Sequence, residues 1–447
     1  MTITTIETSS LGDRSYLIDD GTVAAVIDPQ RDIDRALAAA GERGVMITHV
    51  LETHIHNDYV TGGLELSRVT GAEYVVSALD SVGFPHRPAH DGDVIETGTL
   101  RFRAMHTPGH THHHLSYVLL DGTGSPSAVF TGGSMLYGST GRTDLLGAQH
   151  TTELTHAQYH SVRKLADELP EHTEVYPTHG FGSFCSATPT SGDSSTIGEQ
   201  RAVNPALTQD EQAYVDELIA GLADYPAYYA HMGVINSEGP SPIDLRMPER
   251  VDPATLRRRI DAGEWVVDLR QRRAFAAGHL AGSMGFELST SFVTYLGWLY
   301  RWGAPITLLG TSTRDIMDAR RDLARIGIDN VTGSATGPIE QLATSDQTLR
   351  DYRVASFADV ASARAERPIT VLDTRLSNEH ESGAIRGAIN IPLHELLARR
   401  EEVPSGEVWV HCQSGYRASV AASLLDQPGR EIVLIDDDFD NAQANGG

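Results

Sequence analysis

The sequence predicts an α/β protein with several domains, and three features of the chain support this prediction. Its 447 residues are too many for one ordinary hydrophobic core. Residues 1 to about 235 alternate short apolar runs with helical stretches. The rest of the chain contains an internal repeat, and each copy has the strand and helix pattern of a small α/β domain.

In the first half, the apolar pattern predicts individual elements. The predicted strands are Ser15–Ile18, Ala24–Ile27 and Val45–Leu51. Residues Ile33 to Gly44 have the pattern of a helix that ends at a glycine. The segment 236–250 has three prolines and little periodicity. We therefore predict a first domain over residues 1–235, followed by a linker over 236–250.

The internal repeat is defined by four residues that recur 105 positions later. They are Asp268, Arg270, Gly278 and Gly282 in the first copy, and Asp373, Arg375, Gly383 and Gly387 in the second. Four identities in register, two of them glycines, indicate duplication of one folding unit. The prediction is two α/β domains of about 100 residues, at 251–345 and 354–441.

Composition limits the compartment and the partners. The net charge is −25, from 35 basic and 60 acidic residues, and phosphate groups bind to clustered Lys and Arg, so nucleic acid and anionic membranes are not expected partners. The only cysteines are Cys185 and Cys412, which fits a reducing compartment. The sequence shows no signal peptide and no apolar run that could span a membrane. We expect a cytoplasmic protein.

Histidines concentrate in the first half, where sixteen of the 20 lie between His49 and His231. His54, His56 and Asp58 fall in one loop after an apolar strand. His110 follows a Pro-Gly turn, and His179 follows another short strand. Clusters at three strand-to-loop junctions predict a metal site, and imidazole ligands suit zinc and iron alike.

These residues resemble the pattern of the metallo-β-lactamase superfamily, which has His-x-His-x-Asp-His, a histidine after a Pro-Gly turn, an aspartate and a late histidine. The resemblance covers residues 1 to about 235 and implies an αββα sandwich. It also implies a first metal site formed by His54, His56 and His110. Asp58 and His179 would belong to a second metal site.

Two positions depart from that pattern. Tyr59 stands where the pattern has the second-site histidine, and Gly133 stands where it has the bridging aspartate. Because a two-metal hydrolase needs both, the departures argue against β-lactamase activity and thioester hydrolysis. A single ion bound by His54, His56 and His110 is the expectation.

The branch of the superfamily that the sequence resembles most is the persulfide dioxygenases, which use one non-haem iron held by two histidines and one aspartate. Since Gly133 replaces that aspartate, iron would need a three-histidine site, which suits zinc equally well. The segment Gly141–Asp144 resembles that branch's substrate-contacting segment, so Arg142 is a candidate to bind the carboxylate of a thiol cosubstrate. An ordinary salt bridge is the alternative role for Arg142. Cys185 either contacts the metal pocket or a sulfur substrate, or is a buried structural residue.

Near the C-terminus, Cys412 lies between a short apolar strand and a helical stretch. A cysteine at the start of a helix has a lowered pKa, Gly415 allows the loop to curl, and Arg417 adds positive charge. The loop is therefore a cradle for an anionic sulfur. It resembles the rhodanese active site, whose span from Cys to Arg is six residues, whereas related phosphatase loops have one residue more.

The first copy of the repeat has Gly310 at the position of the cysteine. Without a thiol no persulfide can form, so we predict that 251–345 is a non-catalytic rhodanese-like domain that serves packing or homo-oligomer formation.

The leading functional hypothesis is a fusion of a persulfide dioxygenase with a sulfurtransferase, an oxidoreductase of hydrogen sulfide metabolism. The first domain would oxidise a low-molecular-weight thiol persulfide with O2, using one non-haem Fe(II). Cys412 would carry sulfane sulfur and exchange it with thiosulfate or sulfite. Two alternatives are a mononuclear zinc hydrolase fused to a rhodanese, and a rhodanese with a catalytically lapsed metal domain.

Overall fold

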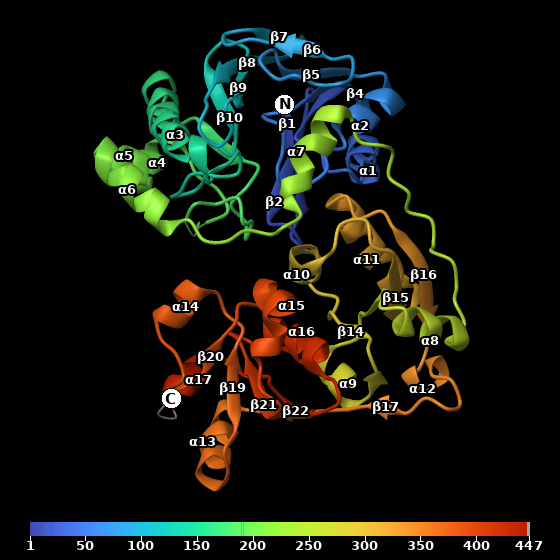
Figure 1. Ribbon diagram of the computed structural model, residues 1–447. Coiled ribbons are helices and arrows are strands. Elements are labelled where there is room, and N and C mark those ends of the chain that lie inside the picture. The colour runs from blue at the N-terminus through green and yellow to red at the C-terminus, as the bar shows by residue number, and fades with distance from the viewer. Residues whose placement is uncertain (189, 191, 445–447) are drawn as a thin grey trace. The chain divides into compact units, whose positions relative to one another are not determined.

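The computed structural model describes residues 1–188, 190 and 192–444 (Figure 1). The chain divides into two compact units, of which the first contains Met1–Asp244 and Ala324–Gly327 and the second contains the rest. Among the described residues, no helix is both long enough and apolar enough to cross a membrane.

The first unit is built on two β-sheets (Figure 1). The six-stranded sheet has the order β1-β2-β3-β4-β5-β6, with strands Thr2–Thr8, Asp13–Asp19, Val23–Ile27, Met46–Leu51, Glu73–Ser77 and Arg87–Ala89. The five-stranded sheet has the order β11-β10-β9-β8-β7. In chain order from β7 to β11, its strands are Val94–Thr97, Leu100–His106, Leu115–Leu120, Pro126–Gly132 and Glu174–Pro177.

Alternation of side chains along each strand separates two packing faces. On β2, Tyr16 and Ile18 pack between the two sheets, whereas Leu17 packs on the opposite face, against helices. On β9, Tyr117 packs between the sheets and Val118 faces helices. These two strands are therefore apolar on both faces, as central strands of a sheet covered on both sides require.

Helices cover the outer faces of both sheets. The first sheet carries α1 (Asp34–Arg43) and α2 (Gly63–Thr70). The second sheet carries α3 (Ala148–Glu168), α4 (Ile197–Val203), α5 (Pro205–Thr208) and α6 (Glu211–Gly221). The result is the four-layer αββα arrangement, which confirms the predicted fold of the first domain.

Helix α7 (Tyr229–Glu238) extends into the segment that the prolines mark as a linker. Its residue Asn236 is only 1% exposed. The Asn236 amide donates to the carbonyl oxygens of His56 and Tyr59, at 2.8 Å each, and accepts from the Thr61 amide at 2.9 Å. The start of the supposed linker is therefore a helix that fastens the first histidine loop.

The second unit contains two lobes, each with a parallel sheet. The first lobe's sheet has the order β14-β12-β15-β16, with strands Met284–Gly285, Trp265–Asp268, Ile306–Gly310 and Val331–Thr336. Its helices are α8 (Pro253–Asp261), α9 (Arg272–Ala277), α10 (Phe292–Leu299), α11 (Thr313–Arg325) and α12 (Ile339–Leu342). The short strands β13 (His279–Leu280) and β17 (Leu349–Arg350) pair separately.

The second lobe's sheet has the order β18-β22-β21-β19-β20, with strands Arg353–Ala355, Arg430–Ile435, Gly406–His411, Thr370–Asp373 and Ile389–Asn390. Its helices are α13 (Phe357–Glu366), α14 (Ser377–Glu381), α15 (Leu396–Arg399), α16 (Tyr416–Leu425) and α17 (Asp440–Ala444), with short 3-10 turns at Leu393–Glu395 and Arg400–Glu402. Apart from β18, the strand order repeats that of the first lobe.

The residues that define the sequence repeat make the same contacts in both lobes. Arg270 pairs with Asp268 at 2.7 Å and donates to the Gly278 carbonyl at 2.8 Å. The matching contacts of Arg375, with Asp373 and with the carbonyl of Gly383, are both 2.7 Å. Gly282 and Gly387 both have positive φ. The four identities therefore preserve one Arg–Asp salt bridge, with its hydrogen bond to a glycine carbonyl, and one glycine turn in each lobe.

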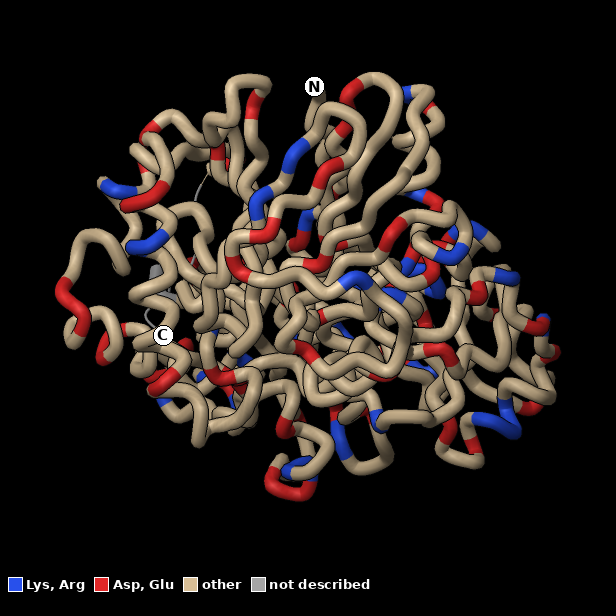
Figure 2. The backbone as a smooth tube through the Cα atoms, turned by 90° about the horizontal axis from the view of Figure 1, so that it is seen from above, with Lys and Arg blue, Asp and Glu red and all other residues tan. Residues whose placement is uncertain are grey.

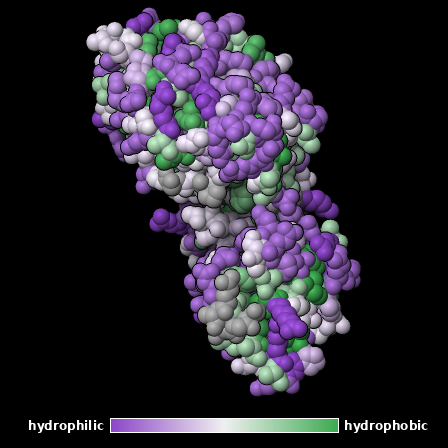
Figure 3. Space-filling view, turned by 90° about the vertical axis from the view of Figure 1, so that its left-hand side faces the viewer, coloured by the Kyte–Doolittle hydropathy of each residue, from purple (hydrophilic) through white to green (hydrophobic). Residues whose placement is uncertain are grey.

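Basic residues are scattered among acidic ones along the backbone (Figure 2). The face drawn in Figure 3 is mainly hydrophilic, with hydrophobic residues dispersed over it.

Candidate functional site

Three histidines from different loops come together between the sheets and the loops of the first unit. His54 follows β4, His110 follows β8 and His179 follows β11. Each offers a ligand atom within 4.8 Å of the others, and all are fully buried. The Nε2 atoms of His54 and His179 are 3.3 Å apart. Two nitrogens bound to one ion at about 2.1 Å with tetrahedral angles would be about 3.4 Å apart.

An oxygen holds the Nδ1 atom of each of these rings. His54 Nδ1 lies 2.8 Å from the Thr53 hydroxyl, which itself donates to Asp28. The Nδ1–H of His110 donates to the carbonyl of Arg142 at 2.7 Å. His179 Nδ1 lies 2.9 Å from Asp13 Oδ1. Such contacts fix the tautomer and leave Nε2 free to accept a metal bond.

The site fits a bound cation. His110 Nε2, His56 Nδ1 and Asp58 Oδ1 are buried and have no hydrogen-bond partner among the described residues, which is rare for polar atoms in a core. Burial also lowers the pKa of His110 to about 3, so its ring is neutral and can bind metal. The buried carboxyl groups of Asp13 and Asp58 both lie against His179 Nδ1, at 2.9 and 3.1 Å.

The structure places His56 differently from the expected first site. Its Nε2 atom faces Glu52 at 3.1 Å, the Tyr59 hydroxyl at 3.0 Å and Asp28 at 3.4 Å. Burial by itself lowers the pKa of His56, but the Asp28 and Glu52 carboxylates raise it to about 9. Ligand atoms of His54, His110 and His179 are thus close enough to hold one ion. His56 instead forms a second possible ligand group with Asp58 and His179.

Tyr59 fills the position where the superfamily pattern has a histidine. Its ring stacks on His56 with a centroid distance of 4.3 Å, and it is completely buried. A phenol buried this way keeps its proton, because burial raises its pKa far above the ordinary value. The second metal site of the pattern therefore lacks a ligand here.

Gly133 leaves space that the His110 ring occupies. A Cβ atom at Gly133 would lie 2.2 Å from His110 Cδ2, and one at Gly141 would lie 2.7 Å from His110 Nδ1. The loss of the aspartate at Gly133 is therefore coupled to the position of His110. Two glycines form the cradle for this ring.

We predict that Gly133→Asp weakens metal binding instead of restoring it. The added side chain must displace His110, and overpacking of this kind costs about 1–3 kcal/mol. Metal content and thermal unfolding measure the effect. Gly122→Asp is the control, because nothing lies within 4 Å of a Cβ there. Tighter metal binding by Gly133→Asp would show that His110 yields and the aspartate joins the ligands.

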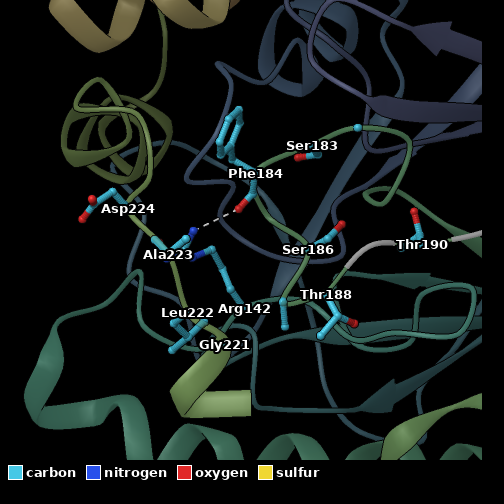
Figure 4. A pocket seen from close by; sticks show the side chains of 12 residues that line it. Arg142, Ser183, Phe184, Ser186, Thr188, Thr190, Gly221, Leu222, Ala223 and Asp224 are labelled. Carbon is cyan, nitrogen blue, oxygen red and sulfur yellow. Dashed lines mark hydrogen bonds between the residues drawn. The ribbon is translucent and has the colours of Figure 1, made fainter. Parts of the chain in front are cut away.

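Arg142 has a structural role in addition to any contact with substrate. Its guanidinium pairs with Asp144 at 2.7 Å and donates to the carbonyls of Phe184 at 3.2 Å and Ala223 at 2.7 Å. It also lies over the Tyr225 ring. Arg142 lines a pocket of about 380 Å³ together with Ser183 and Gly221–Asp224. Figure 4 shows its side chain among these residues. The Arg142 side chain therefore forms the salt bridge given above as its alternative role. The backbone carbonyl of Arg142 orients the His110 ring.

Cys185 lies close to the histidine cluster without being exposed to solvent. Its Sγ atom contacts the Tyr229 hydroxyl at 3.9 Å. Burial raises the pKa of this thiol well above its ordinary value, and the negative charges of Asp58 and Asp13 raise it further. Cys185 therefore stays protonated and unreactive.

Several residues that shape the site carry no motif in the sequence. Asp28 has positive φ, accepts hydrogen bonds from the Thr53 amide and hydroxyl at 2.7 Å each, and so fixes the start of the histidine loop. Glu52 accepts from Tyr74 at 2.9 Å as well as from Thr61. The sequence signal that could have identified Asp28 and Glu52 is that each is a charged residue directly after an apolar strand.

In the second lobe, Cys412 follows β21 directly and α16 begins at Tyr416. Gly415 has a φ of +90°, and a Cβ there would lie 2.4 Å from Asp436 Oδ1, so this position requires glycine. Arg417, in the first turn of α16, donates to Glu379 at 2.8 Å. The structure thus brings Cys412, Gly415 and Arg417 into one loop at the N-terminus of α16.

The equivalent loop of the first lobe is closed by its own carboxylate. Gly310, at the end of β15, corresponds to Cys412, which follows β21. Asp315, five residues after Gly310, corresponds to Arg417, five residues after Cys412. Asp315 Oδ2 accepts from the amides of Thr311 and Ser312, at 3.0 Å each, and from the Thr311 hydroxyl at 2.6 Å. The amides that could bind an anion are already occupied, and the charge at the sixth position is reversed.

We predict that Gly310→Cys alone does not create a second sulfur-transfer site. In a Cys412→Ser background, that variant should form no persulfide with thiosulfate, because Asp315 blocks the amides and repels the donor. Gly310→Cys with Asp315→Arg should form it at the introduced thiol. Mass spectrometry of the intact chain measures the added sulfur. Persulfide formation in the variant that retains Asp315 would contradict the blocking role.

Comparisons with known proteins agree with this architecture. Residues 14–179 match the family model of the metallo-beta-lactamase superfamily, and residues 356–445 match that of the rhodanese-like domain. A crystal structure of a metallo-beta-lactamase from Staphylococcus aureus is similar, with a TM-score of 0.70 and 26% identity. The likeness covers 75% of this chain and 99% of that one, so it extends beyond the first unit.

The fold and the histidine cluster thus define a metallo-β-lactamase-type protein joined to a rhodanese-like domain. The human mitochondrial persulfide dioxygenase ETHE1 is 30% identical over 239 residues, which are 52% of this chain and 81% of that protein. The bovine protein is 31% identical over 206 residues, 45% of this chain and 74% of that protein. The chain belongs to the persulfide dioxygenase family.

Proposed function

We propose that the first unit oxidises the terminal sulfur of a low-molecular-weight thiol persulfide with O2 and water, releasing sulfite, the free thiol and two protons. The relationship to persulfide dioxygenases supports this reaction, and the observation that carries it is the buried cluster of His54, His110 and His179. Tyr59 and Gly133 remove the ligands of a second ion, so the site favours one-metal chemistry over two-metal hydrolysis.

The proposed ligands are the Nε2 atoms of His54, His110 and His179, with Asp58 and the Nδ1 atom of His56 beside them. One Fe(II) ion held there would supply the redox chemistry that O2 requires, and zinc is the alternative. The protein's own contribution is to orient the three rings through Thr53, Arg142 and Asp13. Asn236 holds the loop of His56 in place from α7.

The pocket beside Arg142 is the proposed binding place for the carrier thiol. Ser183 lies in the wall between this pocket and the histidine cluster, with its hydroxyl 3.5 Å from Asp58 Oδ2. A persulfide entering from the pocket would therefore lead its terminal sulfur toward the cluster. To contact the cosubstrate, the Arg142 guanidinium would have to give up one of its hydrogen bonds to Asp144, Phe184 or Ala223.

For the second lobe we propose sulfur transfer through Cys412. The thiolate attacks the sulfane sulfur of thiosulfate, a new S–S bond forms, and sulfite leaves with the electron pair of the broken bond. The first lobe is proposed to be a rhodanese-like domain without catalytic activity. It repeats the strand order and the Arg–Asp salt bridge of the second lobe, but it lacks a thiol. Since both sites are on one chain, the effective concentration of a shared sulfur intermediate is raised.

Oxygen uptake with a thiol persulfide, on anaerobically purified and iron-loaded protein, tests the oxidation. We expect O2 consumption with one sulfite formed per O2. Zinc as the only bound metal, with thioester or other hydrolysis and no O2 uptake, would favour the hydrolase. Failure to retain any metal after reconstitution with Fe(II) would favour a lapsed metal domain and leave Cys412 as the reactive group.

A further inference from the structure

Helix α10 of the first lobe lies beside the cysteine loop of the second. The ring of Tyr295, on α10, is 5.6 Å from that of Tyr416, which begins α16. The Tyr416 hydroxyl donates to the Glu287 carbonyl of the first lobe at 3.0 Å. One turn further along α10, Trp298 stacks on His394 of the second lobe at 5.2 Å and 19°. An aromatic wall from the cysteine-free lobe therefore borders the loop.

Ion pairs also join the two lobes near the cysteine loop. Arg272 and Arg273 of the first lobe both bind Asp436, at 2.6 and 2.5 Å. Asp436 is the residue that leaves no room for a side chain at Gly415. A second group joins His279 to Asp426 at 3.0 Å. These contacts join α9 and β13 of the first lobe to the second lobe.

Tyr295 is half-buried, and its titratable neighbours are Cys412 and Arg417 of the cysteine loop and Glu379 of α14. Burial raises the pKa of its phenol, Arg417 lowers it, and Cys412 and Glu379 raise it. The phenol therefore keeps its proton at neutral pH and is a hydrogen-bond donor beside the thiol and the guanidinium. Among the described residues, none accepts a hydrogen bond from this hydroxyl.

We propose that the first lobe completes the sulfur-transfer site, with the Tyr295 hydroxyl donating a hydrogen bond to the anionic sulfur donor held at Cys412 and Arg417. Tyr295 is then a positioning residue for a small anion that carries a sulfane sulfur, and it keeps its proton while sulfite leaves. The cysteine-free lobe is retained because the catalytic loop needs its aromatic wall. This inference rests on the proposed sulfur transfer by Cys412.

Steady-state transfer from thiosulfate to cyanide by the full-length chain tests the proposal. Tyr295→Phe should raise KM for thiosulfate about 10-fold or more, because a hydrogen bond to a charged group is lost, with a smaller change in kcat. Tyr300→Phe is the control, since its hydroxyl binds the Ala304 carbonyl instead. A structural role alone would lower the unfolding temperature without separating KM from kcat. Unchanged KM and kcat in Tyr295→Phe would overturn the proposal.

A binding measurement separates this proposal from the transfer reaction. Cys412→Ser should bind thiosulfate without reacting, and calorimetry should show binding about 10-fold weaker once Tyr295→Phe is added. If the native chain transfers no sulfur but this difference in binding is found, the transfer function fails and the role of Tyr295 stands. If the native chain transfers sulfur and the two variants bind thiosulfate equally, the role of Tyr295 fails alone.

Discussion

Replacement of His179 by alanine is expected to reduce bound metal from one ion per chain to a small fraction. His179 Nε2 is 3.3 Å from His54 Nε2, and the ring is held by Asp13 and Asp58, which raise its basicity. Removing an outer partner of a ligand typically costs about 10–100-fold in metal affinity, and removing a ligand should cost more. Metal analysis after dialysis against a chelator measures the loss.

Two further variants make this experiment specific. His112→Ala is the control, because His112 lies in the histidine-rich segment of His110 but is half-buried and packs on His150. His56→Ala should lose less metal than His179→Ala, because the Nε2 atom of His56 is engaged by Glu52 and Tyr59. If His56→Ala loses the ion and His179→Ala retains it, the ligand set expected from the sequence pattern is the correct one.

The architecture of the first unit could be predicted because its elements have local signals. Strands β2, β3 and β4 contain the predicted apolar runs, and α1 ends before Gly44, which takes a left-handed conformation. The αββα layers followed from the resemblance of the histidine motifs, which mark the ends of strands in both sheets. The prolines after Asn236 gave no sign that α7 continues to Glu238, because helix ends are weakly encoded when tertiary contacts stabilise them.

The site was harder to predict because imidazole orientation is set by partners distant in sequence. A motif places His54 and His56 in one loop, but their rings point to different partners, Thr53 for one and Glu52 for the other. The approach of His179 to His54 depends on Asp13, which lies 166 residues away from it in the chain. Arg142 likewise acts through its carbonyl, a group that no residue pattern reveals.

The comparison of the two lobes shows what a local loop does encode. Cys412, Gly415 and Arg417 were all identified from one short segment, because a strand, a turn and a helix start fix their relative places. The opposite charge at Asp315 closes the corresponding loop of the first lobe through hydrogen bonds within five residues. What the segment could not reveal is the contribution of α10, which reaches the loop only through packing of the lobes.

Cys412→Ser is expected to abolish sulfur transfer from thiosulfate to cyanide or a thiol, with a loss of at least 1,000-fold, about 4 kcal/mol or more in transition-state free energy. A serine hydroxyl cannot carry sulfane sulfur at neutral pH, and the first lobe has no thiol to replace it. Cys185→Ala is the matched control and should retain transfer, since burial keeps that thiol protonated. Metal content should be unchanged in Cys412→Ser, because the histidine cluster belongs to the other unit. Transfer that persists in Cys412→Ser and disappears in Cys185→Ala would place the reactive sulfur beside the metal site and overturn the role of the rhodanese-like loop.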